Sequence, residues 1–299
     1  MKTDKTFEND AQLKAFLKKE ANRLGISIEN TYNTYFARLL LERISKLSYD
    51  KLYVKGSFSL YSHLNKLIRP VTDLDIVSTE DHHDPILTLY QAMYDSNDDN
   101  IVFELEDLPK KSRTGIYKIR LTANFGKIKH PISIDYQELS PTIYEIKKEM
   151  VFPIFIGQDP FYINTPSLEE HLAEKLCIVA ESTKPDVLNT RVKDFYDIHK
   201  LVEHDYDKEK LSLIFASMIC DRGKIDETIL GTKHLDDEFV NRHLGLWNDM
   251  SKKLEFLDKT VGFKDSVYET KDLLDEQISE VSKNKHLIKS ITPKRKEFV

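Results

Sequence analysis

The sequence predicts an α+β (α/β) fold in which a lobe built on a mixed sheet is followed by an all-helical lobe. Up to about residue 160, short runs rich in Val, Ile, Phe and Tyr alternate with segments of helical apolar spacing. From Pro166 onward, almost every regular segment has the helical period. We therefore place a boundary between residues 160 and 166 and divide the chain into domains 1–160 and 161–299.

The composition is that of a soluble globular protein, with 40% apolar and 31% charged residues among 299. There is no apolar run long enough to cross a membrane, and residues 1–16 lack the apolar core of a signal peptide. We therefore expect a cytoplasmic protein in which Cys177 and Cys220 are reduced, buried thiols. The net charge of −6 argues against a protein that simply coats nucleic acid, although local clusters of Lys and Arg allow a basic patch as well as a solvated surface.

The first half alternates predicted helices and strands. In chain order we expect helices at 7–24 and 30–47, a short strand at 52–56, a helix at 58–67, a strand at 73–78, a helix at 84–95, a polar loop at 96–100, and strands beginning at 101, 116 and 131. Gly25 is expected to follow the end of the first helix, and Ser57 to be the N-cap of the third. Residues 126–130 are expected to join the last two strands as a hairpin connection.

The second half is predicted to be helical throughout. Ser167 and Glu170 form a capping box, which starts a helix that runs to about Ser182. Further helices are expected at about 191–204, 207–221, 235–258 and 264–283, with a poorly ordered tail from residue 286.

Two acids lie one residue apart on the strand at 73–78. Alternation places Asp73 and Asp75 on one face of this strand and its apolar residues on the other. Two carboxylates within roughly 7 Å raise each other's pKa unless a cation lies between them. Because Mg²⁺ prefers oxygen ligands, the pair is a candidate metal site. The alternative is two solvated acids on an exposed strand face.

The surrounding residues favour the metal site. Gly56-Ser57 joins a strand to a helix start, where free backbone N–H groups and the helix dipole attract phosphate. A third acid, Asp135, lies in an otherwise apolar strand and is a further metal candidate, unless that face is simply polar and exposed. Lys66 and Arg69 complete the candidate nucleotide-binding set. This ordered pattern is that of a nucleotidyltransferase palm, in which two Mg²⁺ ions clamp the attacking oxygen and a triphosphate.

The helical half adds three candidates. Lys175 lies on the apolar stripe of its helix, so it either extends to the surface or reaches toward phosphates or the three acids. Asp194 and Asp197 share one face of the next helix, near the margin of its buried stripe. The alternative for this second pair is a capping or surface role.

Taken in order, these motifs resemble the AbiEii-type abortive-infection toxins, including the related MenT toxins. The resemblance rests on Gly56-Ser57, the run from Arg69 to Asp75, the run from Ser167 to Lys175, and the run from Lys193 to Asp197. It covers roughly residues 10–205. It implies a polymerase-β-like nucleotidyltransferase lobe, a helical lobe, and an active site between them.

The resemblance also implies a function. The family consists of toxins of bacterial toxin–antitoxin and phage-defence systems that use a nucleoside triphosphate, and some members add nucleotides to the tRNA 3′ end and so block translation. The implied partner is a co-encoded antitoxin with a winged-helix DNA-binding domain. Two alternatives remain open: a protein or a small molecule as acceptor, and a degenerate palm that binds without transferring.

The resemblance assigns roles by motif. Asp73 and Asp75 would hold Mg²⁺, Gly56 and Ser57 would bind the triphosphate, and Lys175 with Asp194 or Asp197 would fill the remaining essential roles. Two features depart from the family pattern: the spacer between Ser57 and Asp73 is longer, and Val71 replaces a small hydroxyl residue, with Thr72 beside it.

Overall fold

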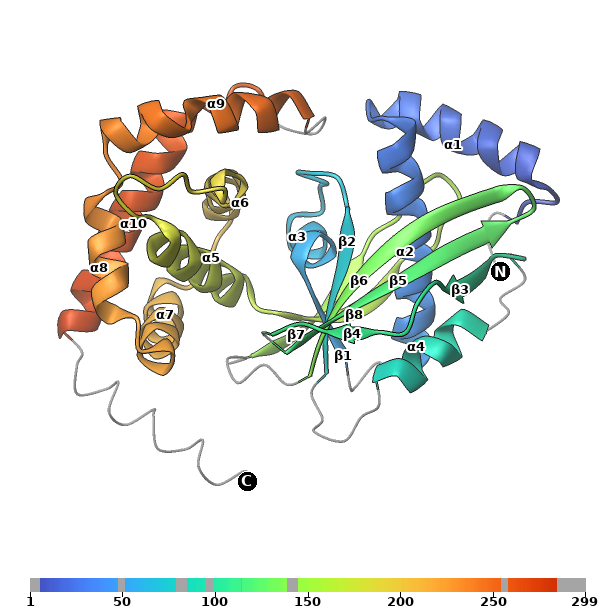
Figure 1. Cartoon of the computed structure of the whole chain (residues 1–299), viewed down its shortest axis with the longest axis horizontal. Helices are drawn as coiled ribbons and strands as arrows, with labels where there is room; N and C mark the ends of the chain where they lie inside the picture. The colour runs from blue at the N-terminus through green and yellow to red at the C-terminus, as the bar shows by residue number, and fades with distance from the viewer. Residues whose placement is uncertain are drawn as a thin grey trace. The chain divides into compact units, whose positions relative to one another are not determined.

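The chain divides after Pro166 into two units, Met1–Pro166 and Ser167–Val299 (Figure 1). The computed structural model describes residues 6–47, 52–78, 85–94, 99–113, 115–138, 145–253 and 258–283. The domain boundary predicted after residue 160 differs from this division by one strand, β8 (Phe161–Pro166). This strand belongs to the first unit because it pairs with β7 (Ile146–Val151).

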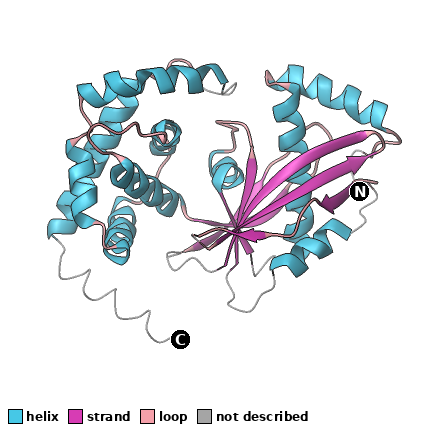
Figure 2. Ribbon diagram, in the orientation of Figure 1, coloured by secondary structure: helices cyan, strands magenta, loops and turns pink. Residues whose placement is uncertain are grey.

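The first unit is built on a mixed sheet, which confirms the predicted fold class (Figure 2). Its strand order is β1-β2-β6-β5-β3, and β4 pairs with β5. The central β2 and β6 run parallel, whereas the other pairs in this sheet are antiparallel. The bounds are β1 (Leu52–Lys55), β2 (Asp73–Ser78), β3 (Val102–Leu105), β4 (Lys110–Lys111), β5 (Ile116–Phe125) and β6 (Ile128–Glu138).

One face of this sheet is covered and the other is polar. On the covered face, Tyr32 and Phe36 of α2 (Ile28–Leu47) pack their rings against His130 of β6, with centroids 5.5 and 5.7 Å away. The neighbouring Ile132 and Ile134 are buried on the same face, whereas residues 131 and 133, which point the other way, are exposed. We call the second face, which carries Asp73, Asp75, Lys118, Arg120, Ser133 and Asp135, the polar face.

The other helices of this unit are α1 (Asp10–Leu24), α3 (Gly56–Leu64) and α4 (Pro85–Tyr94). Helix α1 ends as predicted at Gly25, whose φ of 70° is a left-handed conformation that glycine adopts without strain.

Three local predictions in this unit were wrong. Ser57 is not an N-cap, because α3 already begins at Gly56 and its N-cap position is Lys55. The same helix ends at Leu64 rather than at 67, since Asn65 turns left-handed with φ 47°. The hairpin connection is only Gly126-Lys127, and residues 128–130 already belong to β6. Strands β4, β7 and β8 were not predicted.

The second unit is helical, with α5 (Leu168–Ser182), α6 (Val192–Val202), α7 (Lys208–Arg222), α8 (Ile225–Lys233), α9 (Asp237–Lys253) and α10 (Phe263–Lys283). The Ser167 side chain accepts a hydrogen bond from the Glu170 N–H, which confirms the predicted cap of α5. Helix α8 was not predicted, and it packs closely on α5, since a Cβ on Gly231 would lie 1.9 Å from the Ala180 carbonyl oxygen. Residues 254–257 and the tail from 286 lie outside the described residues.

Both cysteines are free thiols, but their surroundings differ. Cys177 is fully buried, as predicted, and burial raises the pKa of its thiol to about 12. Cys220 is only half-buried, so the prediction of two buried thiols was wrong for this residue. In the part of the chain that the structure describes, every helix is too short or too polar to cross a lipid bilayer.

Candidate active site

The three candidate acids of the first unit lie on two neighbouring strands of the polar face. In the parallel β2–β6 pair, Asp75 is opposite Asp135, and Asp73 is opposite Ser133. All three acids are partly exposed, whereas Leu74 and Ile76 on the opposite face of β2 are 1% and 3% exposed. The strand pairing therefore brings Asp75 and Asp135, which are sixty residues apart in the chain, side by side.

The Gly-Ser turn meets this group of acids at Asp75. Gly56 has a φ of +67°, and a Cβ added to it would lie only 2.0 Å from Asp75 Oδ2. A glycine is therefore required at this position, both for the left-handed backbone and for the close approach of the carboxylate. The first turn of α3 and the Asp75 carboxylate of β2 are therefore in direct contact.

The next residue in this turn has an unused hydrogen-bonding group. Ser57 is 5% exposed, and its buried Oγ atom has no hydrogen-bond partner among the residues that the structure describes. It lies in the first turn of α3, where backbone N–H groups have no partners within the helix. Such a turn can bind an anion. Lys66 and Arg69 follow α3 in the segment before β2, where Lys66 is exposed and Arg69 half-buried.

Two of the acids have polar partners that the sequence did not predict. The Thr72 hydroxyl donates a hydrogen bond to Asp73 Oδ1 over 3.0 Å, so it orients the carboxylate next to it. The Lys118 ammonium of β5 donates to Asp135 Oδ2 and neutralises it.

The register of the hairpin explains this second pairing. Lys118 lies eight residues before Gly126, and Asp135 lies eight residues after Lys127, so a two-residue turn makes them direct partners. A predicted turn of only Gly126-Lys127 would have given the same pair by this count.

The donor set of the first unit fits a divalent cation through two carboxylates. Among the described residues, no three His, Cys, Asp or Glu side chains already surround a common point. Asp73 and Asp75 nevertheless provide the pair of oxygen ligands that Mg²⁺ commonly takes alongside substrate phosphates. Asp135 could join them only when its carboxylate is released by Lys118.

The three candidates of the second unit form an ion-pair cluster of their own. Lys175 of α5 donates to Asp194 Oδ1 at 2.9 Å and to Asp197 Oδ2 at 2.7 Å, both on α6. Lys175 therefore neither extends freely into solvent nor lies unpaired on an apolar stripe. The two acids are 1% and 0% exposed, so their predicted place at the margin of the buried stripe was wrong.

Charge in this cluster is balanced. Arg191 lies with its Nε 2.6 Å from Asp194 Oδ2, so two cations face two carboxylates. Burial alone would raise the pKa of Asp194, but the Lys175 ammonium and the Arg191 guanidinium outweigh it and hold that pKa below its ordinary value. Asp194 therefore stays ionised and holds the Lys175 ammonium in one position.

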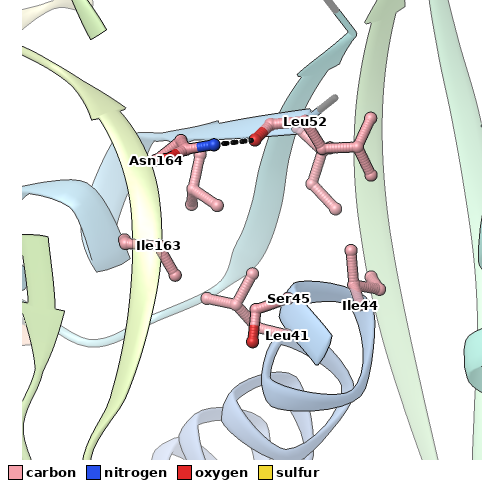
Figure 3. Close-up of a pocket in the computed structure, with 8 residues that line it drawn as sticks. Leu41, Ile44, Ser45, Leu52, Ile163 and Asn164 are labelled. Atoms are coloured by element: carbon pink, nitrogen blue, oxygen red, sulfur yellow. Dashed lines mark hydrogen bonds between the residues drawn. The ribbon is translucent and has the colours of Figure 1, made fainter. Parts of the chain in front are cut away.

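A small cavity of the first unit is separate from these groups (Figure 3). It measures about 10 Å³, roughly the space of one water, and lies between α2 and the sheet. Val54 and Ile76 line it. Their strand neighbours Lys55 and Asp75 point to the opposite face of the sheet, which is the polar face. The cavity therefore opens on the covered face of the sheet and takes no part in the acid site.

Comparisons with known proteins give the family of the chain and support its fold. Residues 38–276 match the family described as "Nucleotidyl transferase AbiEii toxin, Type IV TA system". No curated protein matches the chain in sequence. Among solved structures, MenT4, a nucleotidyltransferase toxin from Mycobacterium tuberculosis, is similar with a TM-score of 0.60 and 13% identity, over 93% of this chain and 97% of that chain. JHP933 from Helicobacter pylori is similar with a TM-score of 0.51 and 16% identity, over 89% and 98% of the two chains.

The structural likeness supports the fold, and the family match identifies the chain. The match confirms the resemblance seen in the motifs and extends it beyond residue 205 into the later helices. It spans most of the sequence and includes all the candidate site residues on both units. The chain therefore belongs to the AbiEii nucleotidyltransferase toxins of type IV toxin–antitoxin systems.

Proposed function

We propose that this protein transfers a nucleotide from a nucleoside triphosphate to a hydroxyl of an RNA acceptor, with the tRNA 3′ end as the expected acceptor, and that it thereby blocks translation. The observation that carries the proposal is the contact of the Gly56 turn with Asp75, beside Asp73 and Asp135 on one sheet face. A phosphate-binding turn next to a pair of acids is the arrangement that nucleotidyl transfer needs.

The first unit would bind the triphosphate. The N–H groups at the start of α3 would bind the far phosphates, and the buried Ser57 hydroxyl could donate to one of them. Asp73 and Asp75 would hold Mg²⁺, which supplies positive charge to the triphosphate when bound. Thr72 keeps the Asp73 carboxylate oriented for this role.

The chemistry is an in-line substitution at the α-phosphorus. The acceptor hydroxyl oxygen forms a bond to this phosphorus, the bond to the β-phosphate oxygen breaks, and pyrophosphate leaves. The hydroxyl proton needs a base, and Asp135 is the accessible carboxylate, with a side chain 21% exposed. Asp194 and Asp197 are poorer bases, because both are buried and hydrogen-bonded to Lys175.

On the resemblance alone, we assign Lys175 one of the remaining essential roles in the transfer. Its side chain is 14% exposed, and two carboxylates hold its ammonium. We assign Asp194 and Asp197 as positioning residues that hold this ammonium in place, since both carboxylates accept a hydrogen bond from it.

The family implies a cognate antitoxin as partner. We propose, on the resemblance alone, that this antitoxin carries a winged-helix domain and that the pair acts in the cytoplasm, with phage defence as its role.

The test is an incubation of purified protein with each of four α-³²P-labelled triphosphates, Mg²⁺ and total tRNA. We expect labelled RNA with wild-type protein and none with Asp75→Ala. Asp107→Ala removes an exposed aspartate of the same unit and should label as wild type does. Full labelling by Asp75→Ala would contradict the metal assignment, and label that resists RNase but is lost with protease would identify a protein acceptor instead.

A further inference from the structure

The charges of the polar face follow a fixed order across the sheet. Reading from β1 through β2, β6 and β5 to β4, the paired positions are Lys55, Asp75, Asp135, Lys118 and Lys110. Two neighbouring acids are thus flanked by lysines on both sides. Successive strands lie roughly 4.8 Å apart, so β1 and β5 are separated by about 14 Å.

The two flanks differ in their neighbours. On the β1 side, the lysine is followed directly by Gly56 and the anion-binding turn of α3. On the β5 side, Lys110, Lys118 and Arg120 are exposed and belong to the same face. The acids therefore lie between a triphosphate-binding side and a cationic strip, which we define as Lys110, Lys118 and Arg120.

The cationic strip is narrow. Beyond it, the same face carries Glu104, paired with Thr122, and Glu106, which accepts a hydrogen bond from the Thr122 hydroxyl. On this side of the acids, the cationic residues next to Asp135 are therefore those of β4 and β5. A strip of this width suits a single nucleic-acid strand. Its cations can bind along the phosphate backbone of that strand without recognising the base sequence. The net charge of −6 means that such attraction must come from a local group of this kind.

Within the strip, Lys118 is attracted by one charged neighbour and repelled by another. It is ion-paired with Asp135, yet its side chain is 60% exposed, and its strand neighbour across β4 is the like-charged Lys110. An ion pair of this exposure contributes little to stability, so the ammonium can change partners at low cost. An RNA phosphodiester is negatively charged, as the Asp135 carboxylate is, so it can compete with that carboxylate for the Lys118 ammonium.

We propose that the cationic strip binds the backbone of the acceptor RNA, and that Lys118 exchanges Asp135 for an RNA phosphate when the acceptor binds. The proposal rests on the proposed function for the identity of the acceptor. In the absence of RNA, Lys118 neutralises Asp135 and disfavours a cation at this carboxylate. When RNA is bound, Asp135 is released beside Asp75, where it can complete the acidic group.

The test compares Lys118→Ala and Arg120→Ala with Lys129→Ala. Lys129 is an exposed lysine of the same face near the far end of the hairpin, opposite Asn124, and serves as the matched control. We expect Lys118→Ala to bind total tRNA about tenfold more weakly at 0.15 M salt, with a slope of log K against log salt smaller by about 1. Lys129→Ala should bind as wild type does, and Lys118→Arg should restore RNA binding.

A second measurement follows the carboxylate without any catalysis. Binding of Mn²⁺ to the protein free of RNA and nucleotide should be several-fold tighter in Lys118→Ala than in wild type, because Asp135 has lost its competing cation. Asp135→Asn should abolish this gain when combined with Lys118→Ala. Melting temperatures of all variants would verify that each is folded.

Three results would overturn the inference. One is RNA binding by Lys118→Ala that equals that of Lys129→Ala. Another is Mn²⁺ binding unchanged from wild type. The third is a raised KM for the triphosphate with unchanged RNA affinity, which would place Lys118 on the nucleotide instead. Failure of the proposed function would be recognised separately, as wild-type protein that labels no RNA, because neither binding measurement requires transfer.

Discussion

Replacing Gly56 by alanine tests the contact on which the candidate site depends. The added Cβ would lie 2.0 Å from Asp75 Oδ2, and approaches below 3.0 Å are essentially never seen. The carboxylate oxygen must therefore move by at least about 1.0 Å, the difference between these distances. It can do so by side-chain rotation, so the displacement itself should cost little stability.

The two expected effects have different sizes. An alanine with φ near +67° destabilises the fold by about 1–2 kcal/mol, because its Cβ crowds the following carbonyl. A misplacement of about 1 Å at a reacting centre costs roughly 10²-fold in rate, equivalent to about 2.7 kcal/mol of transition-state stabilisation. We therefore expect Gly56→Ala to remain folded and to lose about 99% of its activity.

Gly25→Ala separates the two effects. Gly25 has a φ of +70°, and a Cβ there would meet nothing within 4 Å, so this variant carries the same backbone strain without the collision. Chemical unfolding should show similar destabilisation of both variants, while initial rates of nucleotide incorporation should fall only in Gly56→Ala. The double variant Gly56→Ala/Asp75→Ala should be no less active than Asp75→Ala alone, because both changes act on one group. Equal rates for Gly56→Ala and Gly25→Ala would refute the reasoning.

Three further predictions concern the second unit. Lys175→Met leaves the Asp194 and Asp197 carboxylates buried without this cation, so it should lower the free energy of unfolding by about 3 kcal/mol in a urea titration; an unchanged midpoint would contradict the ion-pair cluster. Because the pKa of Asp194 is held below its ordinary value of 3.8, its contribution is complete above that value and is lost as the pH falls through the lower folded pKa. Wild type should consequently lose more stability below pH 4 than Asp194→Asn does, and parallel curves would argue against an ionised Asp194. Iodoacetamide at pH 8 should leave Cys177 unmodified in the native protein and react slowly with Cys220, as peptide mass spectrometry can show; modification of Cys177 without unfolding would contradict its burial and its pKa of about 12.

Local patterns predicted most of the elements and half of the geometry of the site. The cap at Ser167 and the shared face of Asp73 and Asp75 follow from the residue sequence alone, because a helix cap and strand alternation involve neighbours in the chain. The approach of the Gly56 turn to Asp75 also followed from the order strand, turn, helix, strand.

Pairings between distant segments could not be predicted. The sequence left two alternatives for Lys175, a side chain that extends to the surface or one that reaches toward phosphates or the three acids. Its observed partners, Asp194 and Asp197, are on the next helix, and helix packing decides this. The partner of Asp135 was missed because a five-residue hairpin loop was expected in place of two residues, and each residue of error shifts the register. The start of α3 was misplaced by two positions because Ser is a strong N-cap candidate.

The parallel pairing of β2 with β6 decides when the proposed site can form during synthesis. No hairpin joins these strands, so Asp75 gains Asp135 as a neighbour only after the chain has been synthesised through Glu138 and the long connection has closed. A slip of one residue would turn Asp135 toward α2 and expose Ile134 in its place. With the role proposed here for Asp135, nascent or misregistered chains should therefore show no nucleotide transfer.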